Sequence, residues 1–391
     1  MKTTIVLAMI LALAGAPAAA EILDREFPAR SGGRIEFDLE TGASITVTGW
    51  DRDAVSVHAD LSGRDRDDAE VAIEPASGGV VIRSRFGETH GSHSTNFSFD
   101  VRVPRRFDVQ VGSSGGGVTI IDVEGRFAGK TAGGNLTFRR AEGQVELRTL
   151  GGNLNLEDSR LDGSISTNGG NISLSGVEGD LEMKTMGGNV TLEEVSGGVK
   201  TSTMGGNVKY VGSQGGAADP VRLHTMGGQI EVVRAPGGAD LHTMGGNIVV
   251  SSAGDFVEAE TMGGDIRIDD LTGGLKATTM GGDVTVRLVG EPSGSQKDIE
   301  IVSMSGDVDL TVPSGFSMSV EIDLAYTKNS RQDYAIESDL ALQITRTAEW
   351  ERDGESTPRK HIYGRGVFGG GAHQVKIRTI NGDVHLKQGV D

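Results

Sequence analysis

Short alternations of apolar and polar residues recur along the chain at a fixed interval. In the stretch TMGGNVTLEEVSGGVKTS (185–202), Val190 and Leu192 alternate with polar residues, and glycine-rich segments stand on either side. Alternation with a period of two over four to six residues indicates a β-strand and not a helix. We therefore expect each interval to hold two short strands, the second ending at Thr203, separated by two tight turns.

A threonine before each glycine pair sets the length of the interval. Every gap between successive threonines is 18 residues, except for one of 22. Self-similarity at a short fixed period predicts stacked repeats. Imperfect copies flank the series at Ser113, Ser303 and Thr379. The threonines of the series are Thr131, Thr149, Thr167, Thr185, Thr203, Thr225, Thr243, Thr261 and Thr279.

Eighteen residues leave no room for a helical crossover between parallel strands. The chain must therefore coil and lay each strand on its predecessor. We predict an all-β fold, a single-stranded parallel β-solenoid (a β-helix) of roughly eleven to thirteen 18-residue rungs, and we expect it to be right-handed. The threonines would then form a file with one member about 4.8 Å from the next. TMGG recurs because each coil needs the same corner, where glycine permits positive φ.

The residue after each glycine pair forms a second file, in which we expect side-chain amides to bond to one another. Its asparagines are Asn135, Asn153, Asn171, Asn189, Asn207 and Asn247. Toward the C-terminus the file continues as Asp265, Asp283 and Asp307. Stacked carboxylates about 5 Å apart repel one another. A cation such as Ca²⁺ could bridge them; the alternative is that they are solvated turn residues.

A methionine follows the threonine in six corners and follows Ser303 in a seventh. If Leu181, Met183 and Thr185 face inward, strict alternation directs Met186 outward. Three roles are open: a thioether that fills a gap at the corner, an exposed apolar stripe that contacts a partner, or a soft-metal ligand beside His224 and His242. We expect no metal site and no cofactor. The file consists of Met186, Met204, Met226, Met244, Met262, Met280 and Met304.

The period fails at both ends of the chain, which gives four regions. We expect a signal peptide at 1–20, an N-terminal β cap at 21–112, regular repeats at 113–310, and a C-terminal β insertion with a final rung at 311–391. Solenoid ends are open rows of unpaired backbone groups and need caps. We expect Trp50 in one cap, and Tyr326, Tyr334 and Trp350 in the other. The segments 212–220 and 290–297 should loop out of single rungs.

Several stretches together resemble the DUF4097 family of bacterial β-strand-repeat proteins, which are named as candidate adhesins. They are ASITVTGWDRDAVSV, VRVPRRFDVQV, the serial T-x-GGN corners, and VPSGFSMSVEIDLAY closing on KIRTINGDVHL. The similarity spans most of the chain after residue 20. It implies a β-helical fold and a location in the cell envelope, and it brings no catalytic residues.

Export is expected from the N-terminus. Lys2, the apolar run TIVLAMILALAG and Ala18-x-Ala20 match a cleaved secretory signal peptide, and the run is shorter than a membrane span. Cleavage would leave 36 basic against 55 acidic residues, a formal charge of −19. Such an acidic protein is a poor nucleic-acid binder. The chain has no cysteine, so neither disulfides nor a lipoprotein anchor is possible.

Matches to catalytic motifs fail on their context, so we predict no catalytic residue and no enzyme. GRFAGKT (125–131) is one residue short of a phosphate-binding loop. GSSGG (112–116) coincides with a rung turn, and GRGVFG (364–369) is expected in a glycine-rich loop without a following helix.

The favoured function is an exported, non-enzymatic adhesin or structural protein of the cell envelope. Its partner would be an envelope protein or polysaccharide. The protein itself would have no integral membrane span after signal cleavage, and it would be periplasmic, extracellular or at the cell surface. The alternatives are a periplasmic stress- or signalling-associated binding module and a carbohydrate-active β-helix enzyme.

Overall fold

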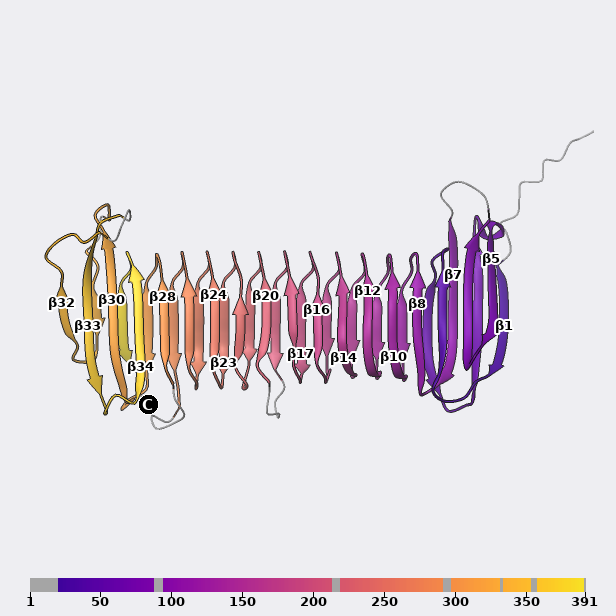
Figure 1. Cartoon of the computed structure of the whole chain (residues 1–391), viewed down its shortest axis with the longest axis horizontal. Coiled ribbons are helices and arrows are strands. Elements are labelled where there is room, and N and C mark those ends of the chain that lie inside the picture. Colours follow the sequence, from indigo (N-terminus) through magenta and orange to yellow (C-terminus); the bar gives the residue numbers. More distant parts are fainter. Residues whose placement is uncertain are drawn as a thin grey trace, which may run out of the picture.

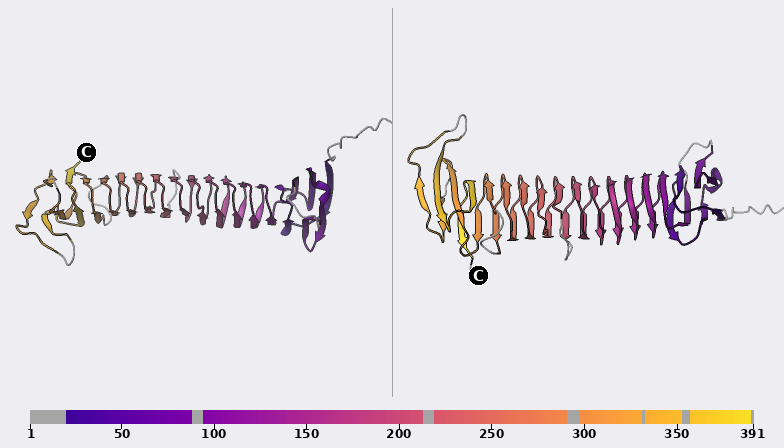
Figure 2. Two further views of the ribbon diagram at one scale, coloured as in Figure 1. Left: turned by 90° about the horizontal axis from the view of Figure 1, so that it is seen from above. Right: turned by 60° about the horizontal axis from the view of Figure 1, so that its bottom comes forward.

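The protein is an elongated rod of stacked strands with a wider cap at each end (Figures 1 and 2). The structure is a computed structural model that describes residues 20–87, 94–212, 219–290, 297–330, 333–352 and 357–389. The expected signal peptide at 1–20 therefore lies almost entirely outside the described residues. The all-β solenoid prediction is confirmed, since the described helical structure is one 3₁₀ turn, η1 (Arg66–Asp68).

Each repeat contributes one strand to each of two long sheets, which face one another across a thin core. In spatial order, sheet A consists of β1 (Glu21–Pro28), β4 (Ala54–Gly63), β7 (Thr95–Pro104), β3 (Ser44–Trp50), β9 (Val118–Ile121), β11 (Leu136–Arg139), β13 (Leu154–Glu157), β15 (Ile172–Ser175), β17 (Val190–Val195), β19 (Val208–Gly212), β21 (Ile230–Arg234), β23 (Ile248–Ala253), β25 (Ile266–Leu271), β27 (Val284–Leu288), β29 (Val308–Val312), β35 (Val384–Gln388) and β31 (Ile336–Ser338).

Sheet B consists of β5 (Ala69–Ala76), β6 (Gly79–Phe86), β2 (Gly33–Leu39), β8 (Phe107–Ser113), β10 (Glu124–Thr131), β12 (Glu142–Thr149), β14 (Arg160–Thr167), β16 (Leu181–Lys184), β18 (Lys200–Thr203), β20 (Val221–Thr225), β22 (Ala239–His242), β24 (Val257–Thr261), β26 (Leu275–Thr279), β28 (Ile299–Ser303), β34 (His373–Ile380), β30 (Met318–Thr327), β33 (Arg359–Phe368) and β32 (Gln343–Arg346).

The rungs stack in parallel and in register, because the sequence period equals one full coil. Thr131 pairs with Thr149, and Thr149 with Thr167. The longer spacings do not disturb this register: β18 pairs with β20, and β26 with β28, position for position. The expected loop-outs at 212–220 and 290–297 lie largely outside the described residues, at 213–218 and 291–296.

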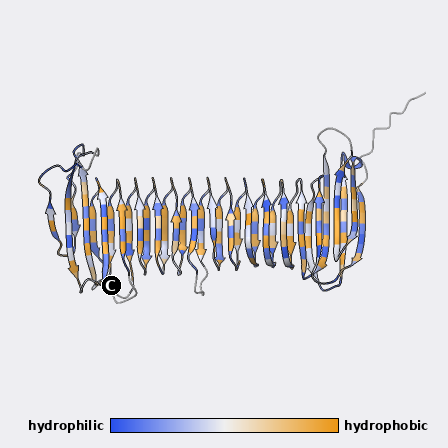
Figure 3. Cartoon of the chain, in the orientation of Figure 1, coloured by the Kyte–Doolittle hydropathy of each residue, from blue (hydrophilic) through white to orange (hydrophobic). Residues whose placement is uncertain are grey.

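The core is a continuous column of inward-facing side chains from both sheets. In one rung, Leu181 and Met183 of β16 face Val190 and Leu192 of β17, and each is at most 1% exposed. Outward positions between them are polar, which gives the striped strands of Figure 3. Alternation with one buried face fixes the register, because a slip of one residue would turn every apolar side chain outward.

At both ends the chain folds back, and the outermost strands pair antiparallel except for β31, which pairs parallel with β35. The first rung, β2 and β3, lies between β6 and β7 on one side and β8 and β9 on the other. Beyond it, β5 pairs antiparallel with β6, and β4 and β1 extend sheet A. This arrangement places hairpins at the end of the stack, where a bare parallel strand would invite aggregation.

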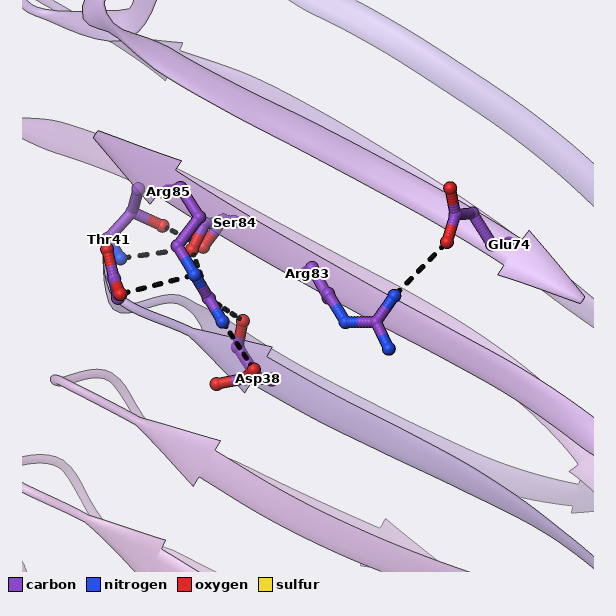
Figure 4. Close-up of polar contacts among 7 residues, drawn as sticks. Asp38, Thr41, Glu74, Arg83, Ser84 and Arg85 are labelled. Atoms are coloured by element: carbon purple, nitrogen blue, oxygen red, sulfur yellow. Dashed lines mark hydrogen bonds and ion pairs between the residues drawn. The ribbon is translucent and has the colours of Figure 1, made fainter. Parts of the chain in front are cut away.

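Polar contacts join this cap to the first rung (Figure 4). Arg85 of β6 pairs with Asp38 of β2, and the hydroxyls of Thr41 and Ser84 lie 2.6 Å apart. Trp50 ends β3, within the N-terminal region 21–112, and its indole nitrogen donates to the carbonyl of Ala54 at the start of β4 over 2.8 Å.

The C-terminal end repeats this arrangement. The final rung, β34 and β35, lies between β28 and β29 on one side and β30 and β31 on the other. β33 covers β30 in antiparallel register, and β32 follows β33. Tyr326 lies against Tyr334 and Trp350, with ring centroids 6.3 and 5.9 Å away. The prediction of a glycine-rich loop at 364–369 was wrong, because most of that stretch is in β33.

Candidate functional site: a methionine ridge on a regular corner

The TMGG corner is held by the threonine hydroxyl, which bonds two rungs at once. The Oγ1 of Thr185 donates to the carbonyl of Gly170 in the preceding rung over 2.8 Å and accepts the N–H of Gly188 over 3.2 Å. The same pair of bonds recurs at the other corners, for example at Thr225. Because the threonines are buried, this file is structural.

The second glycine of each pair is required by the close approach of the rungs, not by its dihedral angle. A Cβ on Gly188 would lie 1.9 Å from the carbonyl oxygen of Gly170. Positive φ, the expected reason, is found at Gly134 but not at Gly188. A Cβ on Gly187 would meet only the oxygen of Asn168, at 4.0 Å.

The asparagine file bonds side chain to backbone, not amide to amide as expected. The Oδ1 of Asn171 accepts the backbone N–H of Asn189 over 2.8 Å, and the bond recurs from rung to rung. An aspartate can replace asparagine because only the acceptor oxygen is used. Asp265 accepts the N–H of Asp283 over 3.0 Å, and Asp283 accepts that of Asp307 over 2.8 Å.

This bonding gives the three carboxylates a structural role. Among the described residues, the one set of three histidine, aspartate or glutamate side chains close enough to hold a metal ion is elsewhere, on sheet B. A cation bridging Asp265, Asp283 and Asp307 stays one of two alternatives, the other being solvated turn residues.

The methionines point outward on seven consecutive rungs, as strict alternation requires. Thr185 is 4% exposed, and the adjacent Met186 is 45% exposed. The file, which we call the methionine ridge, consists of Met186, Met204, Met226, Met244, Met262, Met280 and Met304, each 44–51% exposed. At a strand spacing of about 4.8 Å, the ridge is about 29 Å long.

The ridge stands next to backbone without side chains, because two glycines follow every methionine except Met304. A partner can therefore lie against both the thioethers and the adjacent peptide groups. The ridge stops at Asn168 in one direction, and in the other it continues to the half-buried Ile380. Contiguous exposed apolar surface of this kind marks contact sites in soluble proteins, and methionine adapts to partners of different shape.

A shallow depression lies on the outer face of sheet B near the N-terminal cap. Its volume is about 560 Å³, and its lining includes small residues such as Ala128, Gly129 and Ser164. Glu146 and Arg148 stand among its lining residues. Its lining contains no aromatic side chain other than Phe37, a buried core residue. It therefore lacks the exposed aromatic platform on which sugar rings stack.

Comparisons with known proteins agree with this architecture. The model of the family described as Toastrack DUF4097 matches residues 33–387. No curated protein matches the chain. No helix among the described residues is long and apolar enough to cross a membrane.

Two solved structures are similar to the chain. One is a candidate cell adhesion protein from Clostridium sporogenes, 9% identical, with a TM-score of 0.18, covering 94% of this chain and 100% of that one. The other is a candidate adhesin from Parabacteroides merdae, 10% identical, with a TM-score of 0.19, covering 75% of this chain and 95% of that one.

Proposed function

Because the chain belongs to the Toastrack DUF4097 family, we propose that it is an exported, non-enzymatic binding protein of the bacterial cell envelope with an adhesive or structural role. The observation that supports this most is the methionine ridge. Seven half-exposed methionines occupy the same position on successive rungs, although the corner itself needs only the threonine and the second glycine.

The scaffold suits a protein that presents a surface rather than one that closes around a substrate. Each rung is bonded to the next through both sheets and through the threonine and asparagine files. Such a rod holds its outward residues in a fixed linear array. The array would bind an extended partner through many weak contacts, whose effects multiply when they act together.

The favoured partner is an envelope protein with an extended apolar segment. A polysaccharide fits the ridge less well, because sugars are bound through hydrogen bonds and aromatic stacking, and thioethers supply neither. One methionine file is narrower than a standard protein interface of about 800 Å² per partner. The partner must therefore also touch the outward residues of sheet B beside the ridge.

Location is the first test. The protein, tagged at its C-terminus, would be expressed in source cells that are then treated intact with an external protease. Degradation, or recovery of the protein from the medium, supports adhesion. Protection until the outer envelope is opened would reject the adhesin and leave the alternative, a periplasmic binding module.

The ridge is tested separately. Cells lacking the gene would be complemented with wild-type protein or with Met204→Gln/Met226→Gln/Met244→Gln, and their attachment to surfaces would be counted. The matched control is Lys209→Gln/Glu231→Gln, which removes an exposed ion pair on sheet A of the same rungs. We expect loss of attachment with the methionine variant alone. Equal attachment by both variants would show that the ridge is not the contact surface.

A further inference from the structure

Two histidines and an aspartate converge on the outer face of sheet B. His224 in β20 pairs in register with His242 in β22, and Asp240 lies two residues before His242 on the same face. The Oδ1 atom of Asp240 is 2.6 Å from Nε2 of His242 and 3.7 Å from Nε2 of His224. One ligand atom from each residue lies within 4.8 Å of the others.

The carboxylate oxygen of Asp240 that faces both histidines is the feature that points to a ligand. The Oδ1 atom of Asp240 is shielded from solvent, yet it makes no contact with hydrogen-bond geometry. The two imidazole rings stand edge to face, with centroids 4.8 Å apart. Two protonated imidazoles at this separation would repel each other. A single cation among the three atoms would instead satisfy both neutral rings and the carboxylate.

The geometry points to a binding site for one divalent transition-metal ion, with Zn²⁺ the best-matched ion and the Nε2 atoms of His224 and His242 and the Oδ1 of Asp240 as ligands. Imidazole nitrogen with one carboxylate is a donor set that suits zinc, copper and nickel rather than Ca²⁺ or Mg²⁺. Tetrahedral zinc with bonds of about 2.0–2.1 Å separates its ligands by about 3.3 Å. The two separations from Asp240, 2.6 and 3.7 Å, lie on either side of this value, and the three side chains are 33–49% exposed.

A second layer of residues orients these ligands. The Nδ1 of His242 lies 3.1 Å from a carboxylate oxygen of Glu260. A carboxylate on the far nitrogen fixes the tautomer that presents Nε2 to a metal. Lys276 in turn lies 3.3 Å from Glu260, and Arg222 lies 3.9 Å from Oδ2 of Asp240.

Three protein ligands leave a fourth position open to solvent. A water molecule, or a histidine or carboxylate of a bound partner, would complete the coordination. His224 lies two residues before Met226 of the methionine ridge, and His242 lies two residues before Met244. A metal held there could join the rod to a partner lying along the ridge, and this last step alone rests on the proposed function.

The test is titration of the purified metal-free protein with ZnCl₂ by calorimetry, beside MgCl₂ and CaCl₂. We expect one equivalent of Zn²⁺ to bind and the other two ions not to bind. Asp240→Asn and His242→Ala should each weaken binding at least 10-fold, and Glu260→Gln roughly 10-fold. The matched control is His58→Ala, because His58 forms a similar exposed contact with Asp24, 2.7 Å away, in the N-terminal cap.

Cobalt gives an independent readout. Co²⁺ bound by the three ligands should show the visible absorption of a four-coordinate ion, and the spectrum should vanish in His224→Ala. Circular dichroism of each metal-free variant checks that the fold is intact. No zinc binding by the wild type, or equal binding by Asp240→Asn and the wild type, would overturn the proposal. These results do not depend on where the protein is located or on its adhesion.

Discussion

Two neighbouring glycines should respond to the same substitution in opposite ways. In Gly188→Ala, the added methyl would lie 1.9 Å from the oxygen and 2.4 Å from the carbon of the Gly170 carbonyl. Both atoms are backbone, so no side chain can rotate away. An ordinary contact between non-bonded heavy atoms is about 3.5 Å. The two rungs must therefore separate by more than about 1 Å at this corner.

The hydrogen bonds that cross the corner set the size of the effect. Thr185 Oγ1 to Gly170 and Asn189 N to the Asn171 side chain are both 2.8 Å long. The N–H groups of residues 186 and 187 each donate to the carbonyl of residue 168 over 3.2 Å. Each such bond contributes about 0.5–1.5 kcal/mol to stability. Loss of all four would destabilise this part of the solenoid by about 2–6 kcal/mol.

Gly187→Ala is the matched control, because it adds the same methyl one residue earlier. The nearest atom would be 4.0 Å away, and neither glycine has a φ in the left-handed region. Alanine restricts the unfolded chain more than glycine does, so this variant should be stabilised by about 0.4–1 kcal/mol.

Urea unfolding followed by circular dichroism measures both variants. Stability in a stacked array is distributed among rungs, so hydrogen exchange at the amides of residues 186 and 189 would locate the effect. Equal stability of the two variants would refute the argument that backbone approach, rather than chain flexibility, selects the second glycine.

Four further outcomes follow from the files and the corners. Thr185→Val should cost about 1–3 kcal/mol in urea unfolding, because a buried N–H loses its acceptor, whereas Thr185→Ser should cost less. Asn189→Asp should be close to neutral and Asn189→Ala destabilising by about 1 kcal/mol, since the file needs only an acceptor oxygen. The bidentate hydrogen bond from Arg140 lowers the pKa of Asp122. This pair therefore stabilises the fold above the ordinary aspartate pKa, and the stabilisation is lost as the pH falls through the lowered pKa of the folded state. NMR titration should show a higher pKa for Asp122 in Arg140→Gln than in the wild type. Millimolar Ca²⁺ should leave the melting midpoint unchanged, because the file already uses an oxygen of Asp283 and its neighbours in hydrogen bonds; a rise of several degrees would show that the carboxylates bind the ion.

The periodic part of the fold was predictable because, in a solenoid, the sequence period sets the register between rungs, and the register sets which positions are buried. Once Leu181, Met183 and Thr185 face inward, the outward position of Met186 follows, and the structure confirms it. The reason for the second glycine of the corner was not predicted from the sequence. The sequence suggested positive φ, whereas the actual reason is the close approach of Gly188 to the backbone of the preceding rung, which depends on the three-dimensional stacking.

The ends were predicted only in outline, because their pairing is not sequential. No local pattern indicates that β34 lies between β28 and β30, since the strands that it joins are distant in the chain. The second corner of several rungs has a residue in the left-handed region, where a preference for glycine would be expected. On successive rungs this residue is Arg140, Asp158, Gly176 and Glu194, so only Gly176 among these four fits that preference.

The histidine cluster was partly visible in the sequence. Asp240 and His242 are two residues apart in a strand, which puts them on one face, and His224 lies one period earlier. The pairing of His224 with His242 follows from the register. The convergence of both rings on one carboxylate oxygen does not, because it depends on side-chain rotamers.

Regular and irregular outward positions carry different information in this protein. The buried threonine file and the exposed asparagine file are both fixed by the scaffold, since each bonds one rung to the next. An outward file that stays constant over seven rungs, as the methionines do, has no such requirement and suits a partner that extends along the rod. A set of outward residues that occurs on two rungs only, as the histidines and Asp240 do, suits a ligand the size of one ion. The two surfaces meet at Met226 and Met244, so a partner bound along the ridge would pass beside the metal site.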